Sequence, residues 1–233
     1  MALYLRLRLW MLTFRQYEAS RKTGVCSNPT LLASVSIWLC CLLLGMAVLW
    51  NYALTPGVAA AAPGQWPSGS VLGPLHNRPR IVMVVHPMCS CSRASVNELA
   101  KIMAESRQKA EAFVVFVEPK TASKDWVETA LWRSAATIPG VQLVRDAGGK
   151  EASRFDTASS GQTMFYDGEG HLIFSGGITP ARGHEGDNPG HDAIVSYLNH
   201  GVGRYITSQV FGCSVQGLRT DLNAGNKGAA NAL

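Results

Sequence analysis

The sequence predicts an α/β domain that follows one N-terminal transmembrane helix, and three observations carry this prediction. Short β-branched runs alternate with amphipathic segments between residues 80 and 200, a pattern typical of parallel strands joined by helices. The last two apolar runs flank an Asp-Gly turn, which favours an antiparallel hairpin. An uncharged apolar run precedes all of these segments. We therefore expect a central mixed sheet flanked by helices, behind a membrane anchor.

The apolar run Leu31–Tyr52 has the length and composition of a transmembrane helix. No charged residue occurs between Lys22 and Arg78, and about 20 apolar residues in a helix span the hydrocarbon core of a bilayer. The charged residues before the run are mostly basic, so the positive-inside rule places the N-terminus in the cytoplasm and the rest of the chain outside it. The alternative is a cleaved signal peptide, because residues 58–64 (VAAAAPG) offer small side chains to a peptidase.

Charge and composition divide the rest of the chain. The net charge is +5, but from Arg78 onward 16 basic residues face 15 acidic ones. A nucleic-acid partner would require a basic face on the folded part, so we expect none. Pro, Gly, Ala and Ser dominate one segment without a hydrophobic period, and the C-terminus is small and polar. The expected parts are a cytoplasmic N-terminus (1–30), an anchor (31–54), a linker (55–79), a folded domain (80–212) and a flexible tail (213–233).

The elements of the folded domain follow from local patterns. Buried or half-buried apolar runs predict strands at Arg80–Val85, Ala112–Val117, Val141–Val144, Gln162–Tyr166 and His171–Ser175. Helical spacing predicts helices at Asp125–Ala136, Lys150–Phe155 and Asp192–Gln209, the last with a break near Gly201, and an earlier helix whose apolar face is Val96, Leu99, Ile102 and Met103. The sequence therefore alternates strand and helix until the final hairpin.

Serine and acidic residues supply the expected helix starts. Ser90 or Ser92 would cap the first helix of the domain. Ser95 and Glu98 have the spacing of a capping box one turn later. Asp192 would cap the last helix in the same way.

Three stretches resemble membrane-anchored thioredoxin-like proteins of the bacterial cell envelope. They are HPMCSCSRAS (86–95), VRDAGGKEASRFDTASSGQTMFYDGEGHLIFSGG (144–177) and GGITPARGHEGDN (176–188), and the first and last together resemble the RedB-like group. The resemblance implies a thioredoxin-like fold and thiol–disulfide oxidoreductase activity. It also implies a single-pass protein of the inner (cell) membrane whose domain faces the periplasm and acts on a protein thiol or disulfide client.

The sequence departs from that family at two places. Cys89 and Cys91 form Cys-x-Cys where the family has Cys-x-x-Cys, and Ser92 holds the position of the second cysteine. The family also has a cis-proline beside its thiols, where this chain has Gln162 followed by Thr163. A non-proline cis bond costs about 2.5–4 kcal/mol. We therefore expect a trans bond here, and a substrate groove shaped by Gln162 and Thr163.

The two cysteines at the junction of a strand and a helix indicate redox chemistry. A helix N-terminus lowers the pKa of a nearby thiol, so Cys89 is the expected nucleophile and Cys91 the thiol that resolves its mixed disulfide. No cofactor is then needed. The alternative is a copper-binding or copper-delivery module, in which Cys89 and Cys91 join His86, His184 or His191 as ligands. A scaffold that retains the fold without catalysis is a further alternative.

The glycine-rich loop 176–192 is expected to return to the cysteine end of the sheet. Arg182 or His184 would then hold the thiolate or an anionic substrate, and Glu185 would orient the imidazole of His184. Cys213 follows the last helix. It is either a distant resolving thiol or a tail residue without a role.

Overall fold

The computed structural model describes residues 28–201 and 205–215, so most of the expected cytoplasmic N-terminus and of the tail lies outside the described residues. The chain divides into two compact units, Met1–Asn51 and Tyr52–Leu233. The first contains most of helix α2 (Pro29–Leu54), which has 26 residues, no buried side chain and an 18-residue window with a mean hydropathy of 2.4. By length and composition α2 can cross a membrane, and an N-terminal signal sequence has the same properties.

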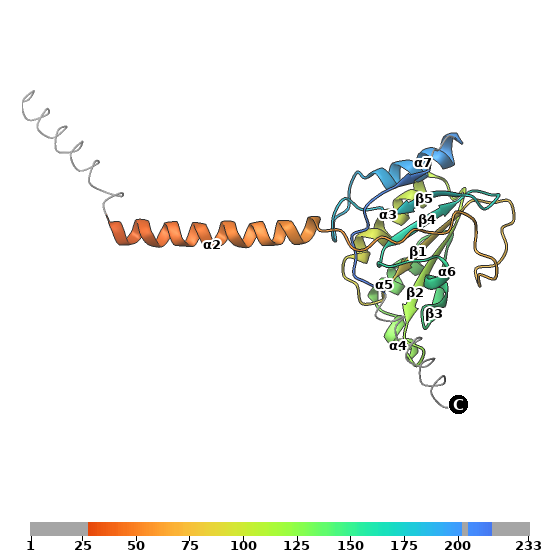
Figure 1. The fold of residues 1–233 in the computed structure, drawn as a ribbon, viewed down its shortest axis with the longest axis horizontal. Helices are drawn as coiled ribbons and strands as arrows, with labels where there is room; N and C mark the ends of the chain where they lie inside the picture. Colours follow the sequence, from red (N-terminus) through yellow and green to blue (C-terminus); the bar gives the residue numbers. More distant parts are fainter. Residues whose placement is uncertain (1–27, 202–204, 216–233) are drawn as a thin grey trace, which may run out of the picture. The chain divides into compact units, whose positions relative to one another are not determined.

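The second unit is built on a mixed sheet (Figure 1). Within the described residues its strand order is β3-β2-β1-β4-β5-β6. The strands are β1 (Arg80–Val85), β2 (Glu111–Glu118), β3 (Val141–Ala147), β4 (Gln162–Tyr166), β5 (Leu172–Gly176) and β6 (Ile206–Thr207). Strands β1, β2 and β3 are parallel, whereas β4 runs antiparallel to both β1 and β5. This arrangement confirms the predicted thioredoxin-like α/β fold.

Helices cover both faces of this sheet, which explains why every residue of β1 is buried. The helices are α3 (Ser92–Glu105), α4 (Lys124–Val127), α5 (Ala130–Ala136), α6 (Lys150–Arg154) and α7 (Pro189–His200). Ile81, Met83 and Val85 share a core with α3, α5 and α7. Val82 and Val84 point to the other face, where they pack in the cluster that contains Ala152 of α6. The apolar face predicted for the first helix, on α3, is fully buried.

The predicted helix caps are wrong at both helices. The residue at the N-cap of α3 is Cys91, and no side chain caps that end. Glu98 does not form a capping box, because its carboxylate is buried and binds partners outside α3. At α7 the cap is Asn188, whose side-chain oxygen accepts a hydrogen bond from the His191 amide at 2.8 Å.

Two predicted helices are shorter than expected. The helix predicted at 125–136 is divided into α4 and α5, because Thr129 adopts extended backbone angles between them. The helix predicted from Asp192 ends at His200, where Gly201 takes a left-handed conformation with φ of 70°. Further along, Ile206 and Thr207 form β6 parallel to β5, so helix is the wrong prediction for these residues.

The segment expected to be a linker packs against the sheet over much of its length. The Tyr166 hydroxyl donates a hydrogen bond to the carbonyl of Pro63 at 2.9 Å. The Trp66 ring lies edge-on to Phe155 and Tyr166, and Leu72 is buried in the same cluster. These side chains cover apolar surface that α6, with only five residues, is too short to cover.

The first residues of the expected tail also belong to the packed unit. The Ser160 amide donates to the carbonyl of Cys213 at 2.8 Å, and the Val215 amide donates to the carbonyl of Ala158 at 2.9 Å. Val215 is completely buried. The packed unit therefore continues past residue 212 to the end of the described chain.

Candidate active site

The turn between β1 and α3 places Cys89 just before the helix. The Cys89 amide donates to the carbonyl of His86 at 3.0 Å, and the Ser92 amide donates to the carbonyl of Cys89 at 3.2 Å. Cys91 has helical backbone angles at the N-cap. Both thiols therefore lie where a strand gives way to a helix, as the motif predicts.

A third thiol lies beside them. The Sγ atoms of Cys89 and Cys213 are 3.3 Å apart although 124 positions separate the residues in sequence. The three Sγ atoms of Cys89, Cys91 and Cys213 all lie within 4.8 Å of one another. Cys89 is 4% exposed and Cys91 8% exposed, whereas Cys213 is exposed to solvent. We call these three residues the thiol cluster.

Backbone contacts fix Cys213 in this cluster. Its carbonyl accepts from Ser160, and Ser214 pairs with Ser159 in an antiparallel bridge. Gly212 lies so close to Ser160 that an added Cβ atom would overlap the Ser160 carbonyl oxygen. The segment that carries Cys213 is thus held against the loop that precedes β4.

The thiols of Cys89 and Cys213 have opposite acidities. Burial raises the pKa of Cys89, but hydrogen bonds from the Ser92 hydroxyl, the Cys213 amide and thiol and the Ser92 amide outweigh it, so the pKa falls to about 7. Burial and the hydrogen bond with Cys89 raise the pKa of Cys213 to about 11. Near neutral pH, Cys89 is therefore the thiolate of the pair, and Cys213 keeps its proton.

Two buried hydroxyls support this end of the site. The Oγ atoms of Ser92 and Ser160 lie 2.7 Å apart, and Ser160 Oγ accepts from the His86 amide at 2.7 Å. Ser92, at the family's second cysteine position, therefore links α3 to the loop before β4 while it also lowers the pKa of Cys89.

The histidines considered as metal ligands lie outside the cluster. His86 Nδ1 accepts from the Met88 amide at 3.1 Å, its ring lies edge-on to Trp126, and burial lowers its pKa. His184 Nδ1 donates to the carbonyl of Arg182 at 2.7 Å. Among the described residues, the group of close metal-ligating atoms at this site consists of the three cysteines alone.

The polar loop residues have roles different from those expected. Arg182 does approach the site, because its Nη1 donates to the carbonyl of Gly212 at 2.9 Å, next to Cys213. Glu185 does not orient His184. Its carboxylate accepts from Asn97 at 2.7 Å and pairs with Lys101 at 3.0 Å, both on α3.

Gln162 and Thr163 are fully buried and bind backbone. The Gln162 amide group donates to the carbonyl of Ala60 at 3.0 Å and accepts from the Ala158 amide at 3.2 Å. Thr163 Oγ1 donates to the carbonyl of Gly161. Within the described residues no peptide bond is cis, so the Gly161–Gln162 bond is trans, as expected.

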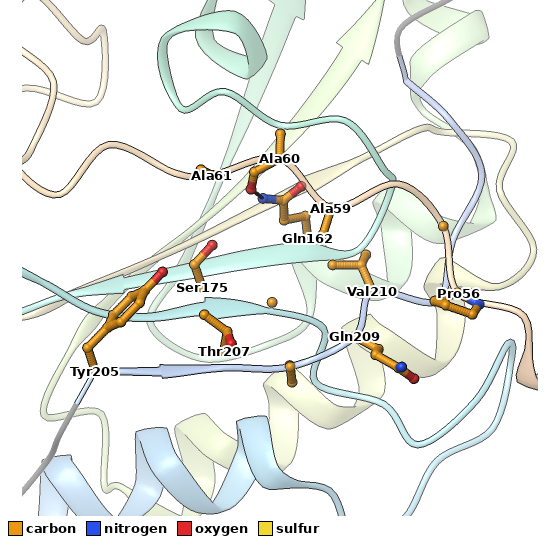
Figure 2. Close-up of a pocket in the computed structure, with 13 residues that line it drawn as sticks. Pro56, Ala59, Ala60, Ala61, Gln162, Ser175, Tyr205, Thr207, Gln209 and Val210 are labelled. Atoms are coloured by element: carbon orange, nitrogen blue, oxygen red, sulfur yellow. Dashed lines mark hydrogen bonds between the residues drawn. The ribbon is translucent and has the colours of Figure 1, made fainter.

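A cavity of about 620 Å³ lies over β4 and β5 (Figure 2). Residues 56–61 and 205–210 form its walls, and Gln162 projects from β4 toward Ala60. No member of the thiol cluster lines it. Gln162 therefore borders this cavity rather than a groove formed by the thiols.

The sequence pattern missed two parts of the site. Ser160 lies in a turn of small residues, and nothing in the local sequence indicated that it belongs to the site. Cys213 was recognised only as an open possibility, because its place depends on a contact between residues distant in sequence. The Phe-Gly-Cys stretch after the last helix is the one local hint, since the glycine permits the close approach to Ser160.

No family model and no curated protein matches the sequence. Among solved structures, the chain is similar to an uncharacterized conserved protein from Geobacillus kaustophilus, with a TM-score of 0.50 and 14% identity over 70% of this chain and 92% of that chain. A secreted Mycobacterium tuberculosis disulfide oxidoreductase homologous to E. coli DsbE gives 0.38 and 13%, over 54% and 83%. A SCO1/SenC family lipoprotein from Bacillus anthracis gives 0.40 and 9%, over 54% and 82%. At such identities the likeness concerns the fold.

Proposed function

We propose that this chain is a membrane-anchored thiol–disulfide oxidoreductase of the bacterial cell envelope, in the RedB-like group that its motif resembles, and that Cys89 is its reactive thiol. The observation that carries the proposal is the position of Cys89 before α3, where hydrogen bonds lower its pKa to about 7 beside other thiols. Thiolate is the form that attacks disulfides. A thiol with a pKa near ambient pH combines a large thiolate fraction with good nucleophilicity.

The proposed reaction is exchange with a client disulfide. The Cys89 thiolate attacks one client sulfur, a bond forms between Cys89 and that sulfur, and the other client sulfur leaves as a thiolate. A second thiol of the protein then attacks Cys89 and releases the client's remaining sulfur. The client disulfide is reduced, and the protein gains one disulfide. The reverse sequence oxidises a client dithiol.

The proposed location is the periplasmic side of the inner membrane. Helix α2 is long and apolar enough for an anchor, and the basic residues that precede it favour a cytoplasmic N-terminus. Disulfides persist outside the reducing cytosol, which suits a domain that cycles between thiol and disulfide forms.

The direct test is Cys89→Ser in the full chain, purified in detergent. Reduction of a glutathionylated peptide should slow by roughly 10³-fold or more, as expected for loss of a nucleophile, while the far-UV spectrum is retained. Ser90→Ala is the matched control, because Ser90 is an exposed neighbour, and it should keep the wild-type rate. A Cys89→Ser variant that turns over at the wild-type rate would exclude this function.

The close approach of three sulfur atoms supports a second candidate, a Cu(I) site. Thiolates are the ligands that Cu(I) prefers, and the thiol cluster supplies three. If this were the function, the chain would retain one Cu(I) ion against a competing chelator. That retention would be lost with any one of the three serine variants, and the exchange rate would not depend on Cys89. A chain with neither activity would be the non-catalytic scaffold.

A further inference from the structure

We infer that Cys213, rather than Cys91, is the resolving thiol, and that it closes a reversible disulfide with Cys89. This inference rests on the proposed function and assigns a residue to its second step. The pair joins the start of α3 to the segment after β6, two parts of the chain that are 124 positions apart.

Distance is the first argument. The Sγ atoms of Cys89 and Cys213 lie 3.3 Å apart, and a disulfide needs about 2.05 Å. The two sulfur atoms must therefore approach by little more than about 1 Å. A bond between Cys89 and Cys91 would instead form a small ring across Ser90, where α3 begins and Cys91 already has helical backbone angles. Disulfide geometry is demanding, so the ring would require the first turn to rearrange.

The support of the segment is the second argument. Hydrogen bonds hold the chain at Cys213 and just after it, from the Ser160 amide to the Cys213 carbonyl and from the Val215 amide to the carbonyl of Ala158. Arg182 also binds the carbonyl of Gly212 at 2.9 Å. A tail residue without a role would not require this support. The contacts hold the Cys213 sulfur beside Cys89 before any client arrives.

Exposure and proton position agree with this order of events. Cys213 is exposed to solvent, so the protein's own side chains do not cover its sulfur. In the resting protein the Cys89 thiolate helps keep the proton on Cys213, since the hydrogen bond and the charge of Cys89 both raise the Cys213 pKa. When Cys89 enters a mixed disulfide, that charge disappears and Cys213 loses its proton more easily. Its thiolate then attacks Cys89, the Cys89–Cys213 bond forms, and the client sulfur leaves and takes up a proton.

The test uses the full chain treated with oxidised glutathione, alkylated with iodoacetamide and digested with trypsin without reduction. Cleavage after Arg80, Arg93, Arg204 and Arg219 places Cys89 with Cys91 in peptide 81–93, and Cys213 in peptide 205–219. The proposed bond joins the two peptides. A bond between Cys89 and Cys91 would leave peptide 81–93 alone and lighter by two hydrogens, with Cys213 alkylated.

Serine variants identify the resolving thiol independently. In Cys213→Ser, glutathione should remain attached to Cys89, and release of the adduct should slow at least tenfold. In Cys91→Ser, the adduct should be released at the wild-type rate and the joined peptides should persist. The opposite pattern would assign the role to Cys91 and overturn the inference while the proposed function stands. If no adduct formed at Cys89 in any variant, the proposed function itself would fail.

Discussion

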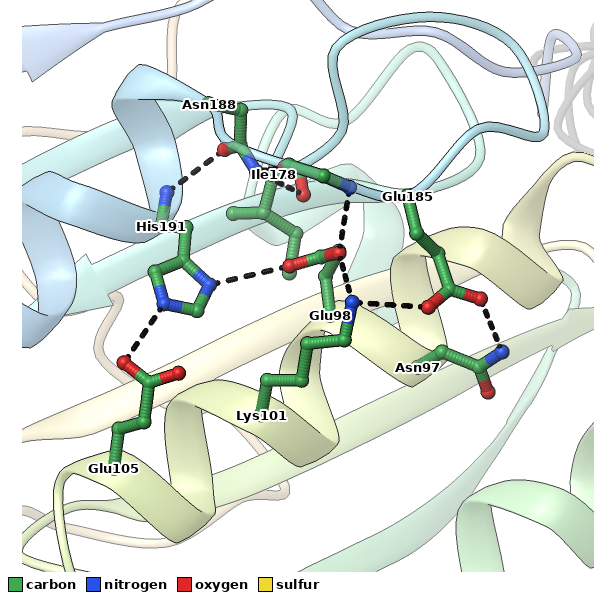
Figure 3. A network of polar contacts seen from close by, with 9 residues as sticks. Asn97, Glu98, Lys101, Glu105, Ile178, Glu185, Asn188 and His191 are labelled. Atoms are coloured by element: carbon green, nitrogen blue, oxygen red, sulfur yellow. Dashed lines mark hydrogen bonds and ion pairs between the residues drawn. The ribbon is translucent and has the colours of Figure 1, made fainter.

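Helix α3 is attached to the C-terminal part of the chain at two places, and the two attachments differ in chemistry. At its start, the thiol cluster and the paired hydroxyls of Ser92 and Ser160 join it through thiols and hydroxyls, among which the pKa of Cys89 is lowered to about 7. Further along α3, Lys101 pairs with Glu185 of the loop before α7, and Glu98 contacts His191 of α7 itself (Figure 3). The thiols of the first attachment can form and break covalent bonds, whereas the contacts of the second attachment can only fix the position of α3.

The centre of the second attachment is Glu98, which is 2% exposed. Its carboxylate accepts from Lys101 at 2.7 Å and from the Gly186 amide at 3.0 Å, and its other oxygen lies 3.2 Å from His191 Nδ1. His191 Nε2 lies 3.2 Å from the exposed carboxylate of Glu105 (Figure 3). His191, one of the three histidines considered as metal ligands, thus joins α7 to α3, and the loop residue Glu185 binds Lys101 nearby.

This comparison teaches that residue type alone does not identify a site on a polar loop. His, Glu and Arg in a glycine-rich loop fit both catalysis and structural pairing. What separates the two attachments is the thiols, since sulfur can exchange covalent bonds and the ion pairs around Glu98 cannot. Three substitutions would separate the attachments by experiment.

Removal of the buried carboxylate should have the largest effect. Glu98→Ala leaves His191, Lys101 and the Gly186 amide without their shared acceptor, and loss of one partner in a buried ionic network costs about 3–5 kcal/mol. Glu105→Ala removes an exposed partner of the same imidazole and should cost less than about 1 kcal/mol. Urea unfolding of the reduced chain, followed by tryptophan fluorescence, measures both. Equal losses of unfolding free energy in the two variants would contradict the central role of Glu98. A changed rate of Cys89 alkylation in a variant that remains folded would contradict the separation of the two attachments.

An added methyl group beside Cys213 should have an intermediate effect on stability and a specific effect on the thiol cluster. Gly212→Ala forces the segment away from the Ser160 carbonyl, and such overpacking costs about 1–3 kcal/mol. The cross-link between peptides 81–93 and 205–219 should decrease in parallel. Gly64→Ala is the control, because open space surrounds Gly64. A Gly212→Ala chain that is destabilised but fully cross-linked would show that the backbone contacts do not position Cys213.

Loss of the Ser92 hydroxyl should have the smallest effect, visible as a pH dependence. The pKa of Cys89 is lowered to about 7, so alkylation in the wild type should rise with pH and reach half its maximum near pH 7. Ser92→Ala removes a hydrogen bond to the thiolate, which raises the pKa and moves the curve to higher pH. A lost hydrogen bond of this kind should slow alkylation at pH 7 roughly fivefold to tenfold. An unchanged pH curve in Ser92→Ala would show that Ser92 does not lower the pKa of Cys89. Ser90→Ala is the control and should give the wild-type curve.

The fold could be predicted from the sequence where one local pattern dominated. Strand β1 has the predicted bounds because a strand covered on both faces is a nearly continuous apolar run, here from Ile81 to Val85. The prediction failed where tertiary contacts override composition. The Pro- and Gly-rich segment before β1 packs through Trp66 and Leu72. Ile206 and Thr207 add a strand because β5 offers an unpaired edge.

The site, like the fold, could be predicted only where a local sequence pattern determines it. The Cys-x-Cys motif after a strand indicated a thiol whose pKa is lowered by the amides of a helix N-terminus. The pKa of Cys89 is lowered against the effect of burial, but chiefly by the Ser92 hydroxyl and by Cys213, and the Ser92 amide at the helix start contributes least. Cys213 could not be assigned, because nothing local states which loop its segment will meet. The roles given to Glu185 and His184 failed because Glu185 binds Asn97 and Lys101 on α3, and His184 Nδ1 binds the carbonyl of Arg182.

The long sequence separation within the proposed Cys89–Cys213 pair links electron transfer to folding. Its oxidised form would be a macrocycle that encloses most of the sheet, and the chain-entropy model gives a ring of this size about 4–5 kcal/mol of stabilisation. The same free energy must appear in the reduction potential, where about 30 mV corresponds to 1.4 kcal/mol for two electrons. The disulfide of a tightly folded domain would therefore be harder to reduce than that of a loosened one. A client that displaces the C-terminal segment from Ser160 would raise the reduction potential of the disulfide and make the protein a stronger oxidant while the client is bound.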